Sequence, residues 1–511
     1  MPPAPLPAAS KGWNALYARP LPWLLALACA HIAIRVAISP SLKWDEAQQI
    51  LWTQQLQWGY GAQPPLYTWL QWCVNQILGP SVLALALLKH ALIVLTCVFM
   101  GLAGRELLGR RAAWWAAASL FLLPPLGWDA INDRPHTVLV TAMTCAAWWL
   151  LLRIVRREGR DCVREFAALG LACGCGMLAK YNFALMLAAL VVALLSVRQA
   201  RRALFGRGWW WAVLIALIVA APHGGWLLAH WGAASAGTLE KMGLAPQPRW
   251  GVGLGDLLTT AAGVLVLWAA VALVAFGSGW WRHPRPAPEQ PAWLGPVFGR
   301  YLALIALALL ALVFAARVMV FKIHWMLPLL APVPLMAFAL RPELENDPRG
   351  NRFAGLTLAL IACVLVAAGT RPWMALINGK VQPANYPAAQ LAQALQEAGY
   401  DGRGRIIAAD NQLAGTLRTR FPAAPAADCS AKESRDVAGC VAAHVQEAGR
   451  AGQGWLLLAH TGRAEPDWWA QALAPLPGGG ASPRQNLRLP FRRVRPDHAP
   501  DSYDFIWHPA Q

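Results

Sequence analysis

Long apolar runs recur as far as residue 371 of this chain, and they constrain its fold more than any other feature. A run of about 20 apolar residues crosses a bilayer as an α-helix, and lipid admits only helices and closed barrels. The chain has 511 residues, is 57% hydrophobic and only 14% charged, which is typical of a polytopic α-helical membrane protein. We predict about eleven spans, at residues 21–39, 81–103, 112–127, 136–153, 165–179, 182–197, 208–226, 256–279, 300–316, 325–340 and 353–371.

Charged residues predict the orientation of these spans. The formal net charge is +18, and residues 372–511 hold 14 Lys/Arg against 12 Asp/Glu, so nearly all of the excess lies in the membrane part. Basic clusters in alternate loops mark the cytoplasmic side. The first loop and the tail are therefore expected outside, on the periplasmic face of a bacterial inner membrane. Because the basic residues flank spans, the high pI does not indicate nucleic-acid binding. The clusters lie at residues 105–111, 153–164, 198–207, 282–300 and 341–352.

The tail, residues 372–511, has the pattern of a separate soluble domain that follows a transmembrane domain at residues 1–371. Helical and strand patterns alternate in it, which predicts a small α/β module. Cys429 and Cys440 lie in this tail, and outside the cytoplasm we expect a disulfide between them rather than two buried thiols. The predicted elements are helices within 386–399, 410–421 and 433–449 and strands within 405–410 and 454–460.

Two adjacent carboxylates, Asp45 and Glu46, follow the first predicted span where the chain leaves the bilayer. They lie in a loop, residues 40–80, whose tryptophans, glutamines and Pro-Pro pair suit a shallow amphipathic segment on the membrane face. An enzyme that acts on a lipid-borne substrate needs a base at this level, whereas a purely structural membrane protein does not. Two alternatives stay open. Asp45 is also a favourable helix N-cap, and Glu46 either positions an acceptor or is a solvated partner of Lys43.

More charged residues are expected on the same outer face. The segment GWDAINDRPHTVL, between the third and fourth spans, adds the acids Asp129 and Asp133. Cations can hold a lipid phosphate and stabilise the leaving group, while a carboxylate deprotonates the incoming hydroxyl. This convergence therefore favours transfer from a lipid phosphate. The candidate substrate-binding residues are Arg134, His136, Lys180, Tyr181, Arg317, Lys322 and His324.

These residues also have structural interpretations. Asp133 either contacts substrate or pairs with Arg134 and caps the fourth span, and Lys180 at a span end either contacts phosphate or snorkels to the interface. His136, His223 and His324 lack a zinc-binding spacing. We therefore expect no metal and no cofactor.

Three segments resemble glycosyltransferase family 39, namely GYGAQPPLYTWL, NDRPHTVL and GMLAKYNFAL. This family comprises dolichyl-phosphate-mannose-protein mannosyltransferase-like enzymes of bacteria and is close to the aminoarabinose transferases of lipid A. The resemblance covers about residues 20–340. It implies a GT-C fold, a polyprenyl-phosphate sugar donor, transfer outside the cytoplasmic membrane, and the first-loop aspartate, Asp45, as catalytic base. The short first loop and the different tail leave lipid A, another envelope glycan and a protein hydroxyl open as acceptors.

We therefore predict an inverting, metal-independent membrane glycosyltransferase, with Asp45, Glu46 and Asp133 as its catalytic candidates. A transporter or flippase of lipid-linked sugars is the alternative, and it would place ionisable residues at mid-membrane depth or show paired repeats. Arg35 and Lys89 are the candidate intramembrane charges. A non-catalytic assembly protein that docks through its tail is a third option, but it leaves the Asp45 segment without a role.

Overall fold

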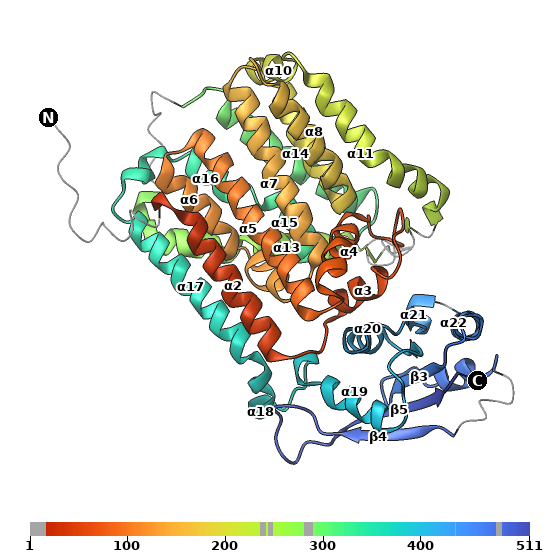
Figure 1. Cartoon of the computed structure of the whole chain (residues 1–511). Coiled ribbons are helices and arrows are strands. Elements are labelled where there is room, and N and C mark those ends of the chain that lie inside the picture. The colour runs from red at the N-terminus through yellow and green to blue at the C-terminus, as the bar shows by residue number, and fades with distance from the viewer. Residues whose placement is uncertain are drawn as a thin grey trace. The chain divides into compact units, whose positions relative to one another are not determined.

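The computed structural model describes residues 17–232, 234–235, 242–243, 249–280, 290–434, 436–476 and 483–510 (Figure 1). Arg282 and Arg285, in one of the predicted basic loops, lie outside these residues. The chain divides into two compact units. Unit 1 comprises Met1–Ala30, Gln57–Tyr67 and Lys89–Leu365, and unit 2 comprises His31–Leu56, Thr68–Leu88 and Val366–Gln511.

Long apolar helices dominate the first 378 residues. In the described part of the chain, seven helices are long and apolar enough to cross a membrane. This confirms the predicted class of polytopic α-helical membrane protein. The seven are α2 (Pro20–Ile38), α5 (Val82–Leu107), α7 (Pro135–Arg156), α11 (Trp209–Ala229), α13 (Trp250–Phe276), α14 (Leu294–Phe314) and α17 (Gly350–Thr370), the last extended by turns to Asn378.

The other four predicted spans also contain helix, but each of these helices is shorter than 18 residues or is interrupted. Helix α6 (Arg110–Ser119) ends before Pro124, and a π-helical turn, Pro125–Ala130, follows it. Proline removes a backbone donor and crowds the preceding turn, which accounts for this break. The exact number of eleven crossings is therefore not confirmed. The remaining helices are α8 (Val163–Ala179), α9 (Asn182–Leu195), which bends by 115° into α10 (Arg198–Leu204), and the pair α15 (Ile323–Leu330) and α16 (Val333–Ala339).

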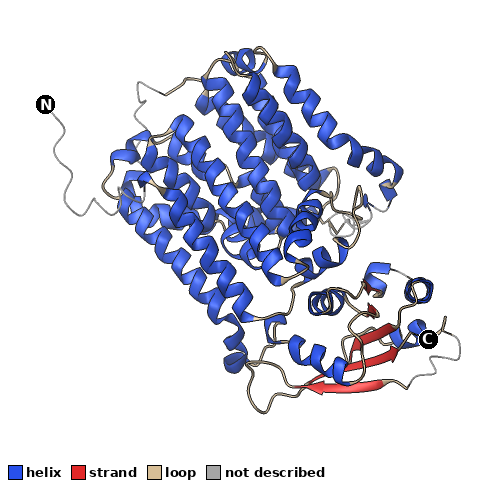
Figure 2. Cartoon of the chain, in the orientation of Figure 1, coloured by secondary structure: helices blue, strands red, loops and turns tan. Residues whose placement is uncertain are grey.

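All five described strands belong to one sheet in the tail (Figure 2). Its order is β2-β1-β3-β5-β4; the first three strands are parallel, and β5 runs antiparallel to both of its neighbours, β3 and β4. In register, Ile407 of β1 lies between Ala427 of β2 and Leu457 of β3. The strands are β1 (Arg405–Ala408), β2 (Ala426–Asp428), β3 (Trp455–His460), β4 (Gln485–Leu489) and β5 (Asp501–His508).

Side chains alternate between the two faces of the sheet along each strand, and apolar side chains lie on both faces. Helices therefore cover both faces. Ile406 and Leu456 pack on one face with residues of α19 and α20, and Ile407 and Leu457 pack on the other with α22 and α23. The predicted α/β module is thus confirmed. The helices of this part are α18 (Met374–Asn378), α19 (Ala388–Glu397), α20 (Asn411–Arg420), α21 (Ala431–Ser434), α22 (Val437–Arg450) and α23 (Trp468–Leu473).

The disulfide predicted in the tail is present. Cys429 follows β2, Cys440 lies in α22, and their Cα atoms are 5.7 Å apart. The bond closes a short loop over the sheet edge, which restricts the unfolded chain more than the folded one.

The first loop packs against the tail within unit 2. Its helices are α3 (Trp44–Trp52) and α4 (Leu66–Leu78), of which Thr68–Leu78 belongs to this unit. Helix α3 lies against α20 at Gly415, where a Cβ atom would come within 2.7 Å of the Cα atom of Ala47. Gln54 also donates to the carbonyl of Ala426 and accepts from its N–H, both at 2.8 Å. The segment that carries Asp45 is therefore part of the same compact body as the α/β module.

Candidate active site

An ion pair between Arg35 and Glu46 joins the end of α2 to the start of α3. The Arg35 Nη2–Glu46 Oε2 distance is 2.6 Å and the Arg35 Nε–Glu46 Oε1 distance is 3.2 Å, so the pair is bidentate. Arg35 also donates to the carbonyls of Ser39 and Ser41, at 2.8 and 3.0 Å. The Arg35 and Glu46 side chains are only 11% and 5% exposed. Glu46 neutralises the positive charge that Arg35 carries near the membrane. Their contact also fixes how the chain turns from α2 into α3.

Asp45 and Glu46 both lie in the first turn of α3. Lys43 precedes the helix in an extended conformation, and its N–H donates to Glu46 at 3.1 Å, which satisfies one of the open donors of the helix end. Negative charge is favourable here because the helix dipole is positive at its N-terminus. Asp45 itself is partly exposed, while Glu46 is buried. Glu46 thus has structural partners, and the Lys43 contact runs through the main-chain N–H.

The second group of candidates surrounds the start of α7 in unit 1. Arg134 caps this helix in the left-handed region, with φ 67° and ψ 50°, and its side chain is exposed. His136 is buried, and its ring centroid lies 5.5 Å from that of Tyr67. Asp133 is partly exposed, and its N–H donates to the Asp129 carbonyl at 2.7 Å. The acid and the two basic candidates therefore share one helix start.

The junction between α8 and α9 uses three consecutive side chains to reach three different helices of unit 1. Lys180 Nζ donates to Thr137 Oγ1 of α7 at 3.0 Å. The Tyr181 hydroxyl and His223 Nε2 of α11 are 3.2 Å apart, and Asn182 donates to the Trp325 carbonyl of α15 at 2.9 Å. The structure therefore brings Lys180 and Tyr181 together with the α7 group.

The third group, around α15, is joined to this junction through the Asn182–Trp325 hydrogen bond. Lys322 is the N-cap residue of α15 and is exposed, and His324 lies in the first turn of the same helix and is partly exposed. Arg317 has a positive φ of 57° and is exposed. The loop between α14 and α15, which carries Arg317 and Lys322, is attached to α13, because Asp256 accepts a 2.5 Å hydrogen bond from the Phe321 N–H.

Several residues that shape this site carry little signal in the sequence. His223 is singled out there only as a histidine without zinc spacing, yet its Nδ1 contacts the Trp58 carbonyl at 2.7 Å while its other nitrogen contacts Tyr181. A polar residue after Pro222 inside an apolar helix was the available signal. Thr137 and Asn182 gave none, because their roles depend on how the helices pack.

Comparisons with known proteins agree with this architecture. Residues 62–226 match the family described as dolichyl-phosphate-mannose-protein mannosyltransferase. The lipopolysaccharide core galacturonosyltransferase RgtA of Rhizobium johnstonii is 32% identical over 79% of this chain and 80% of its own length. Its relative RgtB, also a lipopolysaccharide core galacturonosyltransferase, is 30% identical over 80% of this chain and 83% of its own length. The crystal structure of ArnT from Cupriavidus metallidurans bound to undecaprenyl phosphate has a TM-score of 0.61 at 15% identity, covering 97% of this chain and 98% of that one.

Fold and relatives together define an integral-membrane glycosyltransferase of the GT-C class. The chain belongs to the family of RgtA and RgtB, and its own residues 62–226 match the mannosyltransferase family that the sequence motifs predicted. The resemblance to glycosyltransferase family 39 is thereby confirmed, and the transporter alternative is not favoured.

Replacing Arg35 with Met should destabilise the protein by about 3–5 kcal/mol, because it leaves the buried Glu46 carboxylate without its cation. The double variant R35M/E46Q should recover much of that loss. The apparent melting temperature in detergent measures both. Arg157→Met is the matched control, since Arg157 is 47% exposed in its ion pair with Glu165 and should cost about 1 kcal/mol or less. Equal effects of R35M and R157M would show that the Arg35 pair has no special structural role.

Proposed function

We propose that this enzyme transfers a galacturonosyl residue from a polyprenyl-phosphate donor to a sugar of the lipopolysaccharide core. The observation that carries the proposal is the likeness to two lipopolysaccharide core galacturonosyltransferases over about four-fifths of the chain. The fold shared with an ArnT structure that contains undecaprenyl phosphate supports the choice of a polyprenyl-phosphate donor.

The cations of unit 1 suit such a donor. A uronate sugar phosphate carries two anionic groups, the carboxylate and the phosphate, and each needs charge-assisted hydrogen bonds. Lys180 is oriented by Thr137, and Arg134 is held at the start of the α7 helix. We assign Lys180, Tyr181 and Lys322 to the phosphate, and Arg134, His136, Arg317 and His324 to the rest of the donor headgroup.

Asp45 acts as the general base in this mechanism. Its carboxylate takes the proton from an acceptor hydroxyl as the hydroxyl oxygen bonds to the anomeric carbon, on the side opposite the phosphate. The bond from the anomeric carbon to the phosphate oxygen breaks, and its electron pair leaves with the polyprenyl phosphate. The configuration inverts. Because that phosphate is already a stable anion, cations suffice to stabilise it and no general acid or metal is required.

Glu46 and Asp133 serve this reaction in different ways. The Arg35 ion pair and the Lys43 N–H make Glu46 a positioning residue that holds the first turn of α3. Asp133 lies beside Arg134 at the start of α7, among the donor-binding candidates, so we assign it to donor contact rather than to proton transfer.

The Asp45→Asn variant tests the catalytic assignment. The amide keeps the size of the side chain but cannot take a proton at neutral pH, so the transfer rate should fall by about 10²–10⁴-fold. In a deletion strain, mass spectrometry of the lipopolysaccharide should show loss of one hexuronic acid residue, restored by the wild type and not by D45N. Asp133→Asn is the internal comparison. A greater loss in D133N than in D45N would move the base to Asp133, and intact lipopolysaccharide in the deletion strain would refute the proposed reaction.

The donor assignment predicts a different defect for Lys180→Met. This change keeps the stem and removes the ammonium, so donor efficiency should fall about ten- to a hundredfold through loss of one charge-assisted contact. Steady-state kinetics with varied donor concentration measures it. Lys380→Met, at an exposed position of the tail, is the matched control. Donor kinetics equal to those of K380M would leave Lys180 as an interfacial anchor only.

We also propose that the first loop and the α/β module face the periplasm of a bacterial inner membrane. The alternating basic loops support this orientation, and so does the packing of α3 and α20 within one unit. Single cysteines at Leu56 and Gln390, both exposed, should react with an impermeant thiol reagent in intact spheroplasts. The background lacks the eight unpaired native cysteines, and Arg202→Cys is the cytoplasmic control, reactive only after lysis. The reverse pattern of labelling would overturn the orientation.

A further inference from the structure

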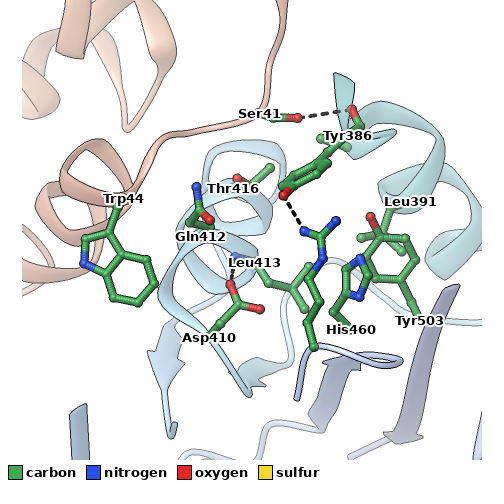
Figure 3. A pocket seen from close by; sticks show the side chains of 12 residues that line it. Ser41, Trp44, Tyr386, Leu391, Asp410, Gln412, Leu413, Thr416, His460 and Tyr503 are labelled. Atoms are coloured by element: carbon green, nitrogen blue, oxygen red, sulfur yellow. Dashed lines mark hydrogen bonds between the residues drawn. The ribbon is translucent and has the colours of Figure 1, made fainter. Parts of the chain in front are cut away.

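A pocket of about 220 Å³ lies in unit 2, next to the first turn of α3 (Figure 3). The first loop contributes Ser41 and Trp44 to its wall, and the α/β module contributes the rest. Trp44 immediately precedes Asp45, so an occupant of the pocket would touch the helix turn that carries the proposed base. The main lining residues from the module are Tyr386, Asp410, Gln412, His460, Arg463 and Tyr503.

Buried polar side chains form one end of this pocket. His460 Nε2 pairs with Asp501 Oδ1, and the Tyr503 hydroxyl donates to Asp501 Oδ2 at 2.5 Å. Asp501, Tyr503 and His460 are 2%, 3% and 8% exposed. A buried polar network is stabilising only where its members are paired, and here the Asp501 carboxylate accepts from the Tyr503 hydroxyl and forms an ion-pair contact with the His460 ring. The network places the imidazole and the phenol ring side by side against the cavity (Figure 3).

The other polar side chains offer acceptors and donors in turn. Asp410 caps α20 by accepting from the Leu413 N–H at 2.8 Å, and its burial raises the pKa of this carboxyl. Arg463 donates to the Tyr386 hydroxyl, and its guanidinium lies 4.5 Å from the centroid of that ring. The Gln412 amide nitrogen donates to the Leu42 carbonyl at 3.3 Å, and the side chain also has a second N–H and a carbonyl acceptor. Acidic and basic groups are therefore mixed, which suits neither an isolated phosphate nor a cation.

We propose that this pocket binds one sugar residue of the saccharide acceptor. Two partly exposed aromatic side chains, Trp44 and Tyr386, provide flat apolar surface for the carbon face of a sugar ring. Its hydroxyls, each a donor and an acceptor, match the mixed polar groups around them. The cavity is smaller than the roughly 300–1,000 Å³ of sites for drug-sized ligands, so it suits a single ring rather than an oligosaccharide.

The position of the pocket explains why it takes acceptor rather than donor. Trp44 and Asp45 are neighbours on α3, and Ser41 and Trp44 are tied to the module by hydrogen bonds to Tyr386 and Asn411. A sugar held here is presented beside the group that deprotonates the acceptor hydroxyl. This inference rests on the proposed function for the identity of the saccharide, but not for the binding itself.

Steady-state kinetics of the full-length enzyme, with donor and acceptor varied separately, tests the proposal. Arg463→Met should raise the acceptor KM about 10- to 100-fold, and Gln412→Ala about 2- to 10-fold, both with unchanged donor KM. Arg463 is exposed and neither residue caps a helix, so both variants should fold. The matched controls in the same module are Arg450→Met and Gln393→Ala, at exposed positions away from the pocket. An acceptor KM for R463M and Q412A within twofold of their controls would overturn the proposal.

A direct binding measurement separates this inference from the proposed reaction. Core oligosaccharide released from the lipopolysaccharide of the host cell is titrated calorimetrically into the full-length protein in detergent. Binding by the wild type and its loss in R463M support the pocket even where no galacturonosyl transfer is found. Equal binding by the wild type and R463M, or none by either, contradicts it.

Discussion

The ion pair between Arg35 and Glu46 is the interaction on which the first loop depends. A guanidinium in the last turn of a membrane helix is costly unless it is paired, and a carboxylate on a side chain that is only 5% exposed is costly for the same reason. Each charge compensates the desolvation of the other, and the two side chains can meet only because the chain turns between Ser39 and Ser41. The contacts of Arg35 with the Ser39 and Ser41 carbonyls hold that turn. The start of α3, and with it Asp45, is therefore determined by electrostatics at the end of α2.

In unit 1, a short segment at the junction of α8 and α9 likewise fixes the positions of several helices. Lys180, Tyr181 and Asn182 are consecutive, and each contacts a different helix. Lys180 is extended, with φ −168° and ψ 139°, so the helix stops at Ala179 and restarts after a single break. Such a break at membrane depth is tolerated where protein rather than lipid satisfies the freed polar groups. The same contacts hold the cations of the proposed donor site in a common frame.

Local patterns of the sequence predicted much of this fold, but contacts between distant segments escaped them. The helix within 410–421, the strand within 405–410 and the Cys429–Cys440 disulfide were predicted from short stretches of sequence, and the structure confirms them. Strand β2 has only three residues, Ala-Ala-Asp, and carries no pattern of its own. Arg35 and Glu46 were each singled out, yet their pairing depends on a chain reversal that no periodicity reveals. The Tyr181–His223 contact likewise depends on helix packing.

Three consecutive residues of α3 have three different surroundings, and helix geometry explains how. Successive side chains of an α-helix point about 100° apart, so neighbours in sequence do not face one another. Trp44 lines the pocket of the α/β module and Glu46 meets Arg35. Asp45 therefore points in a third direction and is partly exposed. The pocket lies on one side of it and the Arg35–Glu46 ion pair on the other. Moving the acid by one position would place it either in the pocket wall or against Arg35. One helix turn thus carries the proposed acceptor contact, the proposed base and the structural anchor without any of the three competing for the same space.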